Sequence, residues 1–491
     1  MHPRLLLPRL GDFLFVCVFA GCMLLGQRML NIDSDLGRHL VLGHYMIESS
    51  NIPLRDVLSF TMAGEPRPPY EWLAQIVFAA AHQLLGMDGV VLLTSFVIAS
   101  AVLLAFLDGR ERSGSPLIAL VLTLWAAAAS SLHWLTRPHV FSFLLLVVWL
   151  RLLERLRLGH RDSVWQLPLT MLIWANLHGA FVIGFLAWAA YAAGWGLERL
   201  RRSASPAIGS RFLLAGLSAL LASIVTPDLW NNWVAVFRNT STYVLGRTTE
   251  TMPVDFTAPG TWPFLGLLVL GMLLALLNRR NIAAAHGFLL LGLAALGVGM
   301  ARNIPLFSLS AAPILATWSR QALRLQLPIA RVEETISKIE RALRAFIWPP
   351  LAVMMAVALL CFHALTAHGS TYGYDPSLFP VQAADWLQRH PIEGNMFNEL
   401  NWGGYLLYRL WPEQRVFIDS QSDFYGEDFT RQYEEAILAR RDWKAYLRAH
   451  DVKWVIIPAS VPLSDALSAD HAYQRVYLDQ TAAIYTALEL P

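Results

Sequence analysis

Long apolar runs separated by short polar turns occupy most of the chain. The runs lie near residues 13–30, 88–107, 116–132, 139–153, 165–177, 179–197, 212–226, 262–278, 283–300, 304–318 and 346–365. A helix of about 20 apolar residues is long enough to cross the hydrocarbon core of a membrane. The pattern therefore predicts a mainly α-helical, polytopic membrane protein with about 11–12 transmembrane helices.

The pattern changes near residue 366, after which short apolar stretches alternate with amphipathic ones. The stretches "RVFID" and "KWVIIP" have the composition of strands, and "FPVQAADWLQRH" and "DWKAYLRAH" have that of helices. This alternation is typical of a small α/β domain. We therefore predict a transmembrane domain at 1–368 and a separate α/β domain at 369–491.

Two further segments have a mixed pattern. Residues 319–345 alternate basic and apolar positions, which predicts an amphipathic helix at the membrane surface. The segment 70–86 is long enough to cross the membrane, but Glu71, Gln75 and His82 favour a re-entrant or interfacial helix. The alternative is that 70–86 crosses and one of the shorter runs does not.

Composition supports the membrane assignment. The chain of 491 residues is 55% hydrophobic and only 15% charged, whereas a soluble protein carries about 25% charged residues. A net charge of +2 gives no indication of a nucleic-acid partner. The three cysteines all lie inside apolar runs, so they predict neither a disulfide framework nor a metal site.

Basic residues between the runs predict the orientation, because cytoplasmic loops are enriched in Lys and Arg. Clusters at Arg110 and Arg112, at 151–161, at 199–211 and within 319–345 fall on one side if eleven spans are counted. The N-terminus is then cytoplasmic, and the C-terminal domain is extracytoplasmic. Residues 31–69 form the first outer loop.

Polar residues gather on that predicted outer side. Asp33, Asp35, Arg38 and His39 directly follow the first run, Glu71 begins the 70–86 segment, and Arg137, His139, His178 and Arg302 lie in short outer turns. Ionisable residues at membrane depth mark functional sites by default, although side chains at helix ends can also snorkel to water. Carboxylates can act as a base, arginines can clamp a phosphate, and histidines can donate to it or relay protons.

The most distinctive stretch of the C-terminal part is "NWGGYLLYRLWPEQRVFIDSQSDFYG". Gly403 and Gly404 permit a tight turn or a close approach of another backbone. Asp419, Asp423 and Tyr425 follow the expected strand, where α/β proteins often place a site. They are interpreted either as capping groups of a structural turn or as part of acceptor recognition.

These motifs resemble a known superfamily. An acidic "DSD" just after the first span, with "YEWLAQ", "TRPHVF", "WANLHGAFVIG", "RNIPLF" and the C-terminal stretch, resembles a group of bacterial membrane proteins of the GT-C superfamily of glycosyltransferases. The chain departs from the group at Tyr70, where His is expected, and at Gln75, where Glu is common.

The resemblance implies a function and roles for particular residues. Asp33 matches the catalytic base of GT-C enzymes, with Asp35 as the nearer alternative and Glu71 as a third acid. Arg38, His39, Arg137, His139, His178 and Arg302 are then substrate-binding residues. The resemblance leaves the cofactor unknown and a divalent metal at Asp33 and Asp35 open.

The substrates implied by the resemblance are a polyprenyl-phosphate-linked sugar and a glycan, lipid or protein acceptor. The enzyme would be a hexosyl- or pentosyltransferase working among membrane lipids at the outer face of the bacterial cytoplasmic (inner) membrane, with no nucleic acid involved. Two alternatives stay open: a lipid or solute transporter, and a non-catalytic cell-envelope assembly protein that retains the fold.

Overall fold

The computed structural model describes the whole chain except residues 1–6, 202–205, 239–242, 244–245, 247–248, 324–326, 344–345, 368, 441 and 489–491. The chain divides into two compact units. Unit 1 consists of residues 1–26, 91–229 and 246–369, and unit 2 of residues 27–90, 230–245 and 370–491. The first loop, which the sequence places with the transmembrane domain, thus belongs to the same unit as the C-terminal residues.

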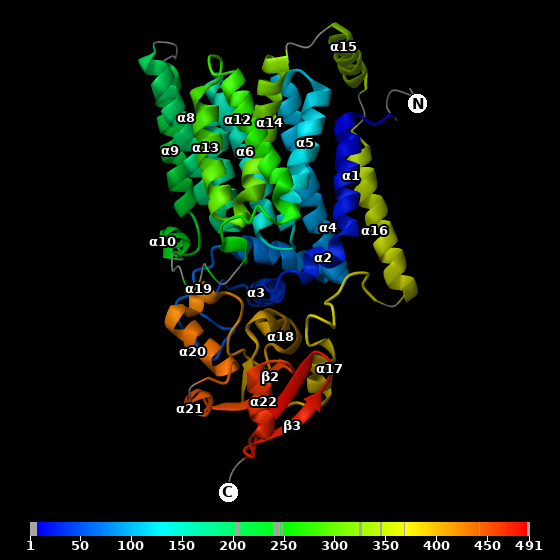
Figure 1. Ribbon diagram of the computed structural model, residues 1–491, viewed down its shortest axis with the longest axis vertical. Coiled ribbons are helices and arrows are strands. Elements are labelled where there is room, and N and C mark those ends of the chain that lie inside the picture. The colour runs from blue at the N-terminus through cyan, green and yellow to red at the C-terminus, as the bar shows by residue number, and fades with distance from the viewer. Residues whose placement is uncertain are drawn as a thin grey trace. The chain divides into compact units, whose positions relative to one another are not determined.

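Unit 1 is built from helices. They are α1 (Leu10–Leu24), α5 (Pro116–Ser130), α6 (His139–Arg157), α7 (Ser163–Leu177), α8 (Val182–Leu200), α9 (Pro206–Ile224), α12 (Trp262–Leu277), α13 (Ala284–Gly299), α14 (Ile304–Leu323), α15 (Leu327–Ala342) and α16 (Trp348–Ala367). Helix α14 packs against α5, α6, α12 and α13, so it lies at the centre of the bundle (Figure 1). Short 3-10 turns η2 (Ser131–His133), η3 (Gly179–Phe181), η4 (Thr249–Thr251), η5 (Pro259–Thr261) and η6 (Ala301–Asn303) connect the helices.

The predicted apolar runs all lie in helices. Within the described residues, six helices are long and apolar enough to cross a membrane: Trp72–Ser113, Pro116–His133, Gly179–Leu200, Ala207–Ile224, Pro259–Leu277 and Trp348–Thr366. Helices α1 and α13 are apolar but shorter. The runs at 139–153, 165–177 and 304–318 form α6, α7 and α14. The protein is therefore a mainly α-helical membrane protein, as the apolar pattern predicts.

Helix α4 (Trp72–Ser113) is interrupted at Leu85 and Gly86, whose backbone angles are not helical. Gly86 has φ +61°, a left-handed conformation that glycine adopts without steric cost. The part before the break, 72–84, is about 20 Å long at 1.5 Å per residue, which is less than the roughly 30 Å of the hydrocarbon core. This length favours the interfacial reading of 70–86.

The predicted helix at 319–345 is divided in the structure. Helix α14 continues to Leu323 and α15 covers Leu327–Ala342, while 324–326 and 344–345 lie outside the described residues. Two acids of α15 face the bundle: Glu333 accepts a hydrogen bond from Ser115, and Glu340 pairs with Arg110 at 3.0 Å. Helix α15 is thus attached to unit 1 by its acidic side chains.

Unit 2 combines helices with one mixed sheet. Its helices are α2 (Gly26–Asn31), α3 (Leu36–Ser49), α10 (Asn231–Arg238), α17 (Val381–Arg389), α18 (Gly403–Leu410), α19 (Ser422–Tyr425), α20 (Glu427–Ile437), α21 (Trp443–Ala449) and α22 (Pro462–Ala469), with the 3-10 turn η7 (Leu400–Trp402). The strands β1 (Asn395–Asn398), β2 (Val452–Pro458), β3 (Tyr473–Leu478) and β4 (Ala482–Ala487) are ordered β1-β2-β4-β3. Strand β1 pairs parallel with β2, and the other two pairs are antiparallel.

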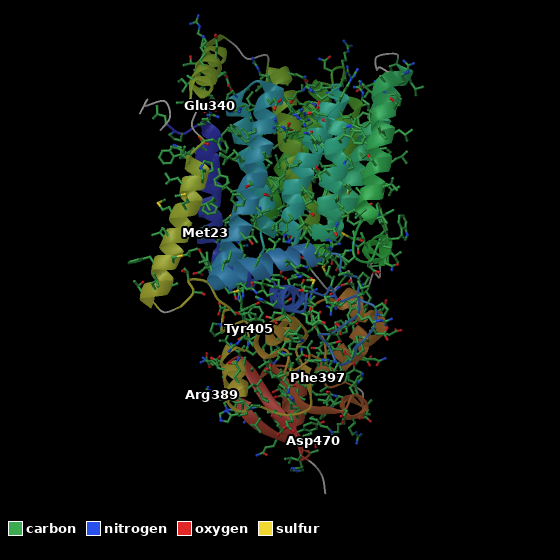
Figure 2. All side chains as sticks on the ribbon, turned by 180° about the vertical axis from the view of Figure 1, so that it is seen from behind. Met23, Glu340, Arg389, Phe397, Tyr405 and Asp470 are labelled. Atoms are coloured by element: carbon green, nitrogen blue, oxygen red, sulfur yellow. The ribbon has the colours of Figure 1, made fainter. Side chains whose placement is uncertain are left out.

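Strand β2, in the middle of the sheet, is buried on both faces, whereas the edge strand β3 is partly exposed. Successive side chains of a strand point to opposite faces. Trp454 and Ile456 of β2 accordingly pack with α3, α17 and α18, whereas Val455 and Ile457 pack with α20, α21 and α22. Figure 2 marks one residue of each apolar cluster, Tyr405 and Phe397, and both are almost fully buried. The first loop thus contributes helix α3 to one covering layer of the sheet.

One predicted strand is wrong. "RVFID" (415–419) is extended but forms only an isolated bridge, between Val416 and Ser59 of the first loop. The backbone N–H of Phe417 donates to the side chain of Asn398 at 2.8 Å. The backbone of 415–419 thus bonds to the Asn398 side chain and to the first loop instead of to a neighbouring strand. The segment therefore stays outside the sheet. The predicted strand "KWVIIP" and the predicted helices "FPVQAADWLQRH" and "DWKAYLRAH" are present as β2, α17 and α21.

Candidate active site

Asp33 and Asp35 lie where α2 ends and α3 begins. Asp35 is the N-cap residue of α3, but its side chain does not cap the helix. It pairs instead with Arg38 at 3.1 Å and accepts a hydrogen bond from the Ser420 hydroxyl. One oxygen of Asp33 accepts the backbone N–H of Asp35 at 3.1 Å, which orients the Asp33 carboxylate. Both acids are 5% exposed.

Buried ion pairs continue from Asp35 through unit 2. Arg38 lies 3.9 Å from Asp419, Asp419 lies 3.2 Å from Arg67, and Arg67 pairs with Asp56. All of these side chains are almost fully buried. We call Asp33, Asp35, Asp56, Asp419, Arg38 and Arg67 the carboxylate cluster. The cluster joins the first loop to the segment around Asp419. Arg67 and Asp419, for example, are more than 350 residues apart in the sequence, as are Arg38 and its hydrogen-bond partner Gln421.

The acids beside Arg38 and Arg67 keep both side chains positively charged. Burial by itself would lower the pKa of Arg38, but Asp35, Asp419 and Glu71 outweigh it and raise the pKa above its usual value. Burial likewise opposes the charge of Arg67, and Asp419 and Asp56 raise its pKa. A buried charge that is paired in this way costs far less than an isolated one. Both guanidinium groups are therefore permanent cations.

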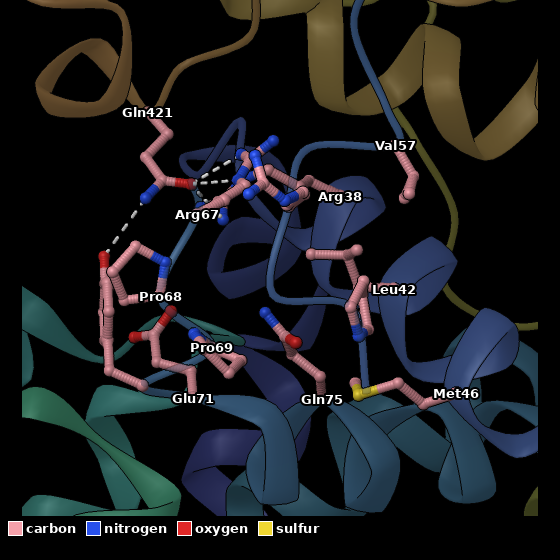
Figure 3. A pocket seen from close by; sticks show the side chains of 13 residues that line it. Arg38, Leu42, Met46, Val57, Arg67, Pro68, Pro69, Glu71, Gln75 and Gln421 are labelled. Atoms are coloured by element: carbon pink, nitrogen blue, oxygen red, sulfur yellow. Dashed lines mark hydrogen bonds between the residues drawn. The ribbon is translucent and has the colours of Figure 1, made fainter. Parts of the chain in front are cut away.

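Gln421 connects the two arginines to a pocket. Its carbonyl oxygen accepts hydrogen bonds from Arg38 at 3.0 Å and from Arg67 at 2.6 Å, and its amide donates to the Tyr70 hydroxyl at 3.4 Å (Figure 3). Burial, with Asp423 and Glu71 nearby, raises the pKa of Tyr70 well above its usual value, so the phenol stays protonated. Tyr70, the residue at which the chain departs from the family pattern, therefore contributes a hydroxyl to this pocket.

The pocket measures about 410 Å³, including the solvent at its mouth. Arg38, Arg67, Gln421, Glu71 and Gln75 form its polar side. The apolar side chains of Leu42, Met46 and Val57 also line it (Figure 3). A pocket with an apolar wall and a few fixed polar groups is typical of a small-molecule site.

His39 and Glu71 extend the polar side of the site. His39 lies on α3, with its Nδ1 3.8 Å from Glu71 and 3.3 Å from the Gln75 side-chain nitrogen. Helices α3 and α4 approach closely here, because a Cβ atom on Gly43 would lie 2.2 Å from the Gln75 carbonyl oxygen. Gln75, the second departure from the family pattern, thus hydrogen-bonds a predicted substrate-binding residue.

Glycines allow the first loop and the C-terminal segment to meet. A Cβ atom on Gly37 would lie 2.0 Å from the Gly404 carbonyl oxygen, and one on Gly404 would lie 2.2 Å from the Ser34 carbonyl oxygen. A Cβ atom on Gly403 would clash with the backbone of Ile418 and Asp419. The close backbone approach predicted for Gly403 and Gly404 is therefore present, and it sets Asp419 beside α3.

The arrangement does not suit a metal site built from protein ligands alone. Ca²⁺ takes six to eight oxygen ligands, whereas Mg²⁺ keeps several waters among its six. In the part of the chain that the structure describes, no group of three or more His, Cys, Asp or Glu could hold a metal. The Arg38 guanidinium also occupies the place beside Asp35 that a cation would take. The function proposed below therefore uses no metal step.

Other predicted site residues lie together in unit 1. His133 ends η2, His139 begins α6 and His178 follows α7. The His133 and His139 rings are tilted with centroids 4.7 Å apart, and the His139 and His178 rings meet edge to face at 6.5 Å. Arg137 pairs with Glu250 at 3.3 Å, and His133 lies 3.5 Å from the same carboxylate.

Arg302, on η6, is close enough to act electrostatically on all three histidines, as Arg137 does. We call His133, His139, His178, Arg137, Arg302 and Glu250 the histidine cluster. The structure thus brings the four predicted residues Arg137, His139, His178 and Arg302 together within one unit.

Sequence reasoning missed Asp56, Arg67, Ser420 and Gln421. A signal for Arg67 was present, because it is a basic residue in a predicted outer loop, which is the argument that singled out Arg137 and Arg302. No local signal marks Gln421 or Asp56. Their partners lie far away in the sequence, so only the folded chain shows their role.

Comparison of the sequence with protein-family models and with curated proteins returns no match. Comparison with solved structures does find matches. Apo Archaeoglobus fulgidus oligosaccharyltransferase aligns with a TM-score of 0.60 at 13% identity, over 90% of this chain and 69% of the other. The same organism's AglB, in complex with an inhibitory peptide and a dolichol-phosphate, aligns with 0.57 at 12% identity, over 97% and 75%.

A bacterial structure aligns over nearly its full length. ArnT from Cupriavidus metallidurans bound to undecaprenyl phosphate aligns with a TM-score of 0.51 at 12% identity, over 97% of this chain and 98% of ArnT. At this identity the likeness concerns the fold, and it agrees with the motifs found in the sequence. The chain has the fold of the GT-C superfamily of membrane glycosyltransferases.

Proposed function

We propose that the protein is a membrane glycosyltransferase that moves a sugar from a polyprenyl-phosphate-type lipid to a glycan, lipid or protein acceptor. The reaction would take place at the outer face of the bacterial cytoplasmic membrane. The observation that carries the proposal is a GT-C fold with buried, oriented carboxylates at Asp33 and Asp35. Two of the similar structures hold a polyprenyl-type phosphate, undecaprenyl phosphate in ArnT and dolichol-phosphate in AglB, which supports the donor class.

In this proposal Asp33 is the base. Its carboxylate takes the proton of an acceptor hydroxyl or amide as the acceptor atom attacks the anomeric carbon. The bond from that carbon to the phosphate oxygen breaks, and the lipid phosphate leaves with the electron pair. The backbone N–H of Asp35 orients Asp33 at 3.1 Å. Asp35 is already bound to Arg38 and Ser420, which suits a positioning role better than proton transfer.

The leaving phosphate needs compensation for its negative charge. In the proposal Arg137 and Arg302 supply it, since guanidinium groups bind phosphate oxygens through two parallel hydrogen bonds. Arg38 is less suited, because Asp35 and Asp419 already pair with it. The histidine cluster is thus assigned to the donor lipid and the carboxylate cluster to the acceptor.

The test is the substitution Asp33→Asn, which keeps the size of the side chain and removes its basic oxygen. Loss of a general base lowers the rate by about 10²–10⁴-fold. Transfer is measured as loss of labelled sugar from the lipid-linked fraction of membranes that contain the full-length protein. Asp375→Asn is the matched control, because the Asp375 side chain caps only the turn at Ser377 in the same unit.

Three results would contradict the proposal. Full transfer by Asp33→Asn at normal protein levels would remove Asp33 from catalysis. Absence of transfer by the wild type, with sugar-lipid or solute moved intact across the membrane, would favour the transporter. Neither activity, with binding of envelope components retained, would favour the assembly protein.

The proposed orientation has its own test. With residues 366–491 outside, a cysteine replacing exposed Ser377 should react with an impermeant thiol reagent in intact cells. A cysteine replacing exposed Thr335 on α15 should react only after the cells are opened. The reverse pattern would place the C-terminal part in the cytoplasm and would contradict an outer-face reaction.

A further inference from the structure

The hydrogen bonds around Gln421 have a fixed direction. Its carbonyl oxygen accepts from Arg38 at 3.0 Å and from Arg67 at 2.6 Å, and a guanidinium group can only donate. The reverse orientation of the amide would place its own N–H groups against these donors. The Gln421 nitrogen therefore faces the Tyr70 hydroxyl, at 3.4 Å, and donates to the phenol oxygen (Figure 3).

Tyr70 is left with a hydrogen of its own to donate. A phenol oxygen accepts and its O–H donates, and the bond from Gln421 uses the accepting side. Among the described residues the Tyr70 hydroxyl makes no other hydrogen bond. Tyr70 is partly exposed and lines the pocket of unit 2. Its O–H therefore requires an acceptor atom of a bound molecule or of water.

The neighbouring residues of α4 add further polar atoms to the pocket. Gln75 is 6% exposed, and His39 bonds one of the two polar atoms of its amide at 3.3 Å. The other polar atom of that amide has no hydrogen-bond partner in the part of the chain that the structure describes. Glu71 contributes a carboxyl group to the same lining (Figure 3). Hydroxyl groups suit this mixture, because each can both accept and donate.

The charges of the pocket are close to balance. Two of its arginines, Arg38 and Arg67, already pair with acids of the carboxylate cluster. The remaining charged side chains of the lining are Arg55 and Glu71, one of each sign. A charged ligand would bring an uncompensated charge into a partly buried site, which costs free energy. A neutral ligand therefore suits the pocket better than a charged one.

The apolar wall and the number of polar groups favour a sugar ring. Leu42, Met46 and Val57 line the pocket together with the polar side chains. A sugar ring can place its C–H groups against such a wall while its hydroxyl groups bond the polar side. A Ser, Thr or Asn side chain of a protein acceptor carries one polar group, fewer than this pocket can bond. The volume of about 410 Å³ lies in the usual range of small-molecule sites.

We propose that this pocket binds a neutral sugar unit of the acceptor, and that the Tyr70 hydroxyl donates a hydrogen bond to one of its oxygens. This inference rests on the proposed function, which assigns the carboxylate cluster to the acceptor, and it narrows that acceptor to a sugar-bearing molecule. Gln421 is a positioning residue, because its amide donates to the phenol and so leaves the phenol hydrogen for the ligand. Tyr70, where the chain departs from the family pattern, then recognises the acceptor.

The first test measures binding of small probes to the purified full-length protein in lipid nanodiscs, by saturation-transfer NMR titration. The probes are neutral methyl hexosides and pentosides, the charged methyl glucuronide and methyl glucosaminide, and capped Ser, Thr and Asn. We expect a neutral glycoside to bind more tightly than the charged glycosides and the capped amino acids. Binding by none of the neutral glycosides, or tighter binding of a charged or amino-acid probe, would overturn the inference.

The second test uses variants with the glycoside that binds. Tyr70→Phe should weaken its binding by roughly two- to tenfold, the effect of one lost hydrogen bond. Gln421→Glu should do the same, because a carboxylate still accepts from the arginines but also takes the Tyr70 hydrogen. The double variant should bind no more weakly than either single one, since both remove the same bond. Tyr477→Phe is the matched control, because it loses a bond to Asp479 in the same unit.

Unchanged binding by Tyr70→Phe, or an equal loss in Tyr477→Phe, would overturn the role of Tyr70. Additive losses in the double variant would contradict the positioning role of Gln421. A further arm separates the acceptor from the donor, whose sugar has the same chemistry. The same glycosyl unit is attached to a short polyprenyl phosphate, and Tyr70→Phe should leave binding of this form unchanged. Equal weakening would place the donor sugar in the pocket and overturn the assignment to the acceptor.

Failure of the proposed function gives a different result. A protein that binds the glycoside through Tyr70 but transfers no sugar would retain the sugar site and lose only the transferase assignment. A protein that transfers sugar through Asp33 but binds no neutral glycoside would retain the transferase assignment and lose the sugar site.

Discussion

The carboxylate cluster and the histidine cluster balance their charges in opposite ways. The carboxylate cluster contains two guanidinium groups and four carboxylates, and both arginines are buried in ion pairs with three of these acids. The histidine cluster contains two arginines, three histidines and one acid, Glu250, which pairs with Arg137. Excess negative charge suits a site that takes a proton, and excess positive charge suits a site that receives a phosphate.

The difference predicts what a substitution does in each cluster. The arginines of the carboxylate cluster are saturated by side chains of the protein itself, so removing a partner leaves a buried charge without compensation. In the histidine cluster, the proposal assigns Arg137 and Arg302 to the phosphate of the donor lipid. Loss of an acid that pairs with Arg38 or Arg67 should therefore affect folding, and damage to the histidine cluster should affect binding.

The largest expected effect is on stability, for Asp419→Ala. Asp419 lies between Arg38 and Arg67, and breaking a buried ion pair by removing one partner costs about 3–5 kcal/mol. Denaturant unfolding of the full-length protein should show this loss. Asp385→Ala is the control, because Asp385 is half exposed and pairs with Arg409 at the surface, where an ion pair contributes about 0–1 kcal/mol. Equal losses in the two variants would contradict the comparison.

A smaller effect is expected on binding, for Arg137→Lys and Arg302→Lys. Lysine keeps the charge but loses the planar fork that binds phosphate oxygens. One lost charge-assisted hydrogen bond of about 1.5 kcal/mol weakens undecaprenyl phosphate binding by roughly tenfold. Stability should change little. Arg151→Lys, at a surface pair with Glu111, is the control and should bind normally. Full binding by both cluster variants would remove the arginines from the phosphate site.

The smallest effect concerns a carboxylate of unit 2 that lies outside the cluster. Burial raises the pKa of Glu399 from 4.5 to about 7, and both groups that donate hydrogen bonds to it, the backbone N–H of Trp402 and the side-chain amide of Asn401, are neutral. The folded state therefore holds this proton more tightly than the unfolded state does. Its contribution to stability is fully present below pH 4.5 and is lost as the pH rises to about 7.

Glu399→Gln, which stays neutral, should remove this pH dependence. At pH 8 the variant should be more stable than the wild type by about 1 kcal/mol, a value reduced for the partial exposure of the residue. The measurement is the unfolding midpoint at pH 5 and pH 8. A wild-type midpoint as pH-dependent as that of the variant would contradict the raised pKa.

The sequence predicted the helices of unit 1 well, because apolar length alone specifies a membrane helix. For Gly403 and Gly404 it predicted a tight turn or a close backbone approach, and the structure shows the close approach. It failed at "RVFID", whose apolar residues resemble a strand. Whether such a stretch joins a sheet depends on distant partners, here Ser59 and Asn398.

The candidate site was only half visible for the same reason. Asp33, Asp35 and Arg38 lie within six consecutive residues, so a short sequence motif contains all three. Arg67 and Gln421 reach the same place from positions separated by 354 residues. Periodicity and composition do not indicate that Arg67 and Gln421 come together. Only the folded chain shows the hydrogen bonds between them.

The joining of α3 to α18 through Gly37 and Gly404 also constrains how the protein is made. The first and last segments of unit 2 are separated in the chain by residues 91–369, whose synthesis takes roughly 15–60 s at about 5–20 residues per second. During that interval Arg38 and Arg67 have their partners Asp35 and Asp56 within the first loop, but Asp419, which later pairs with both arginines, has not yet been made. Synthesis thus includes a waiting period, and the buried contacts of the first loop are completed only when the last quarter of the chain has emerged.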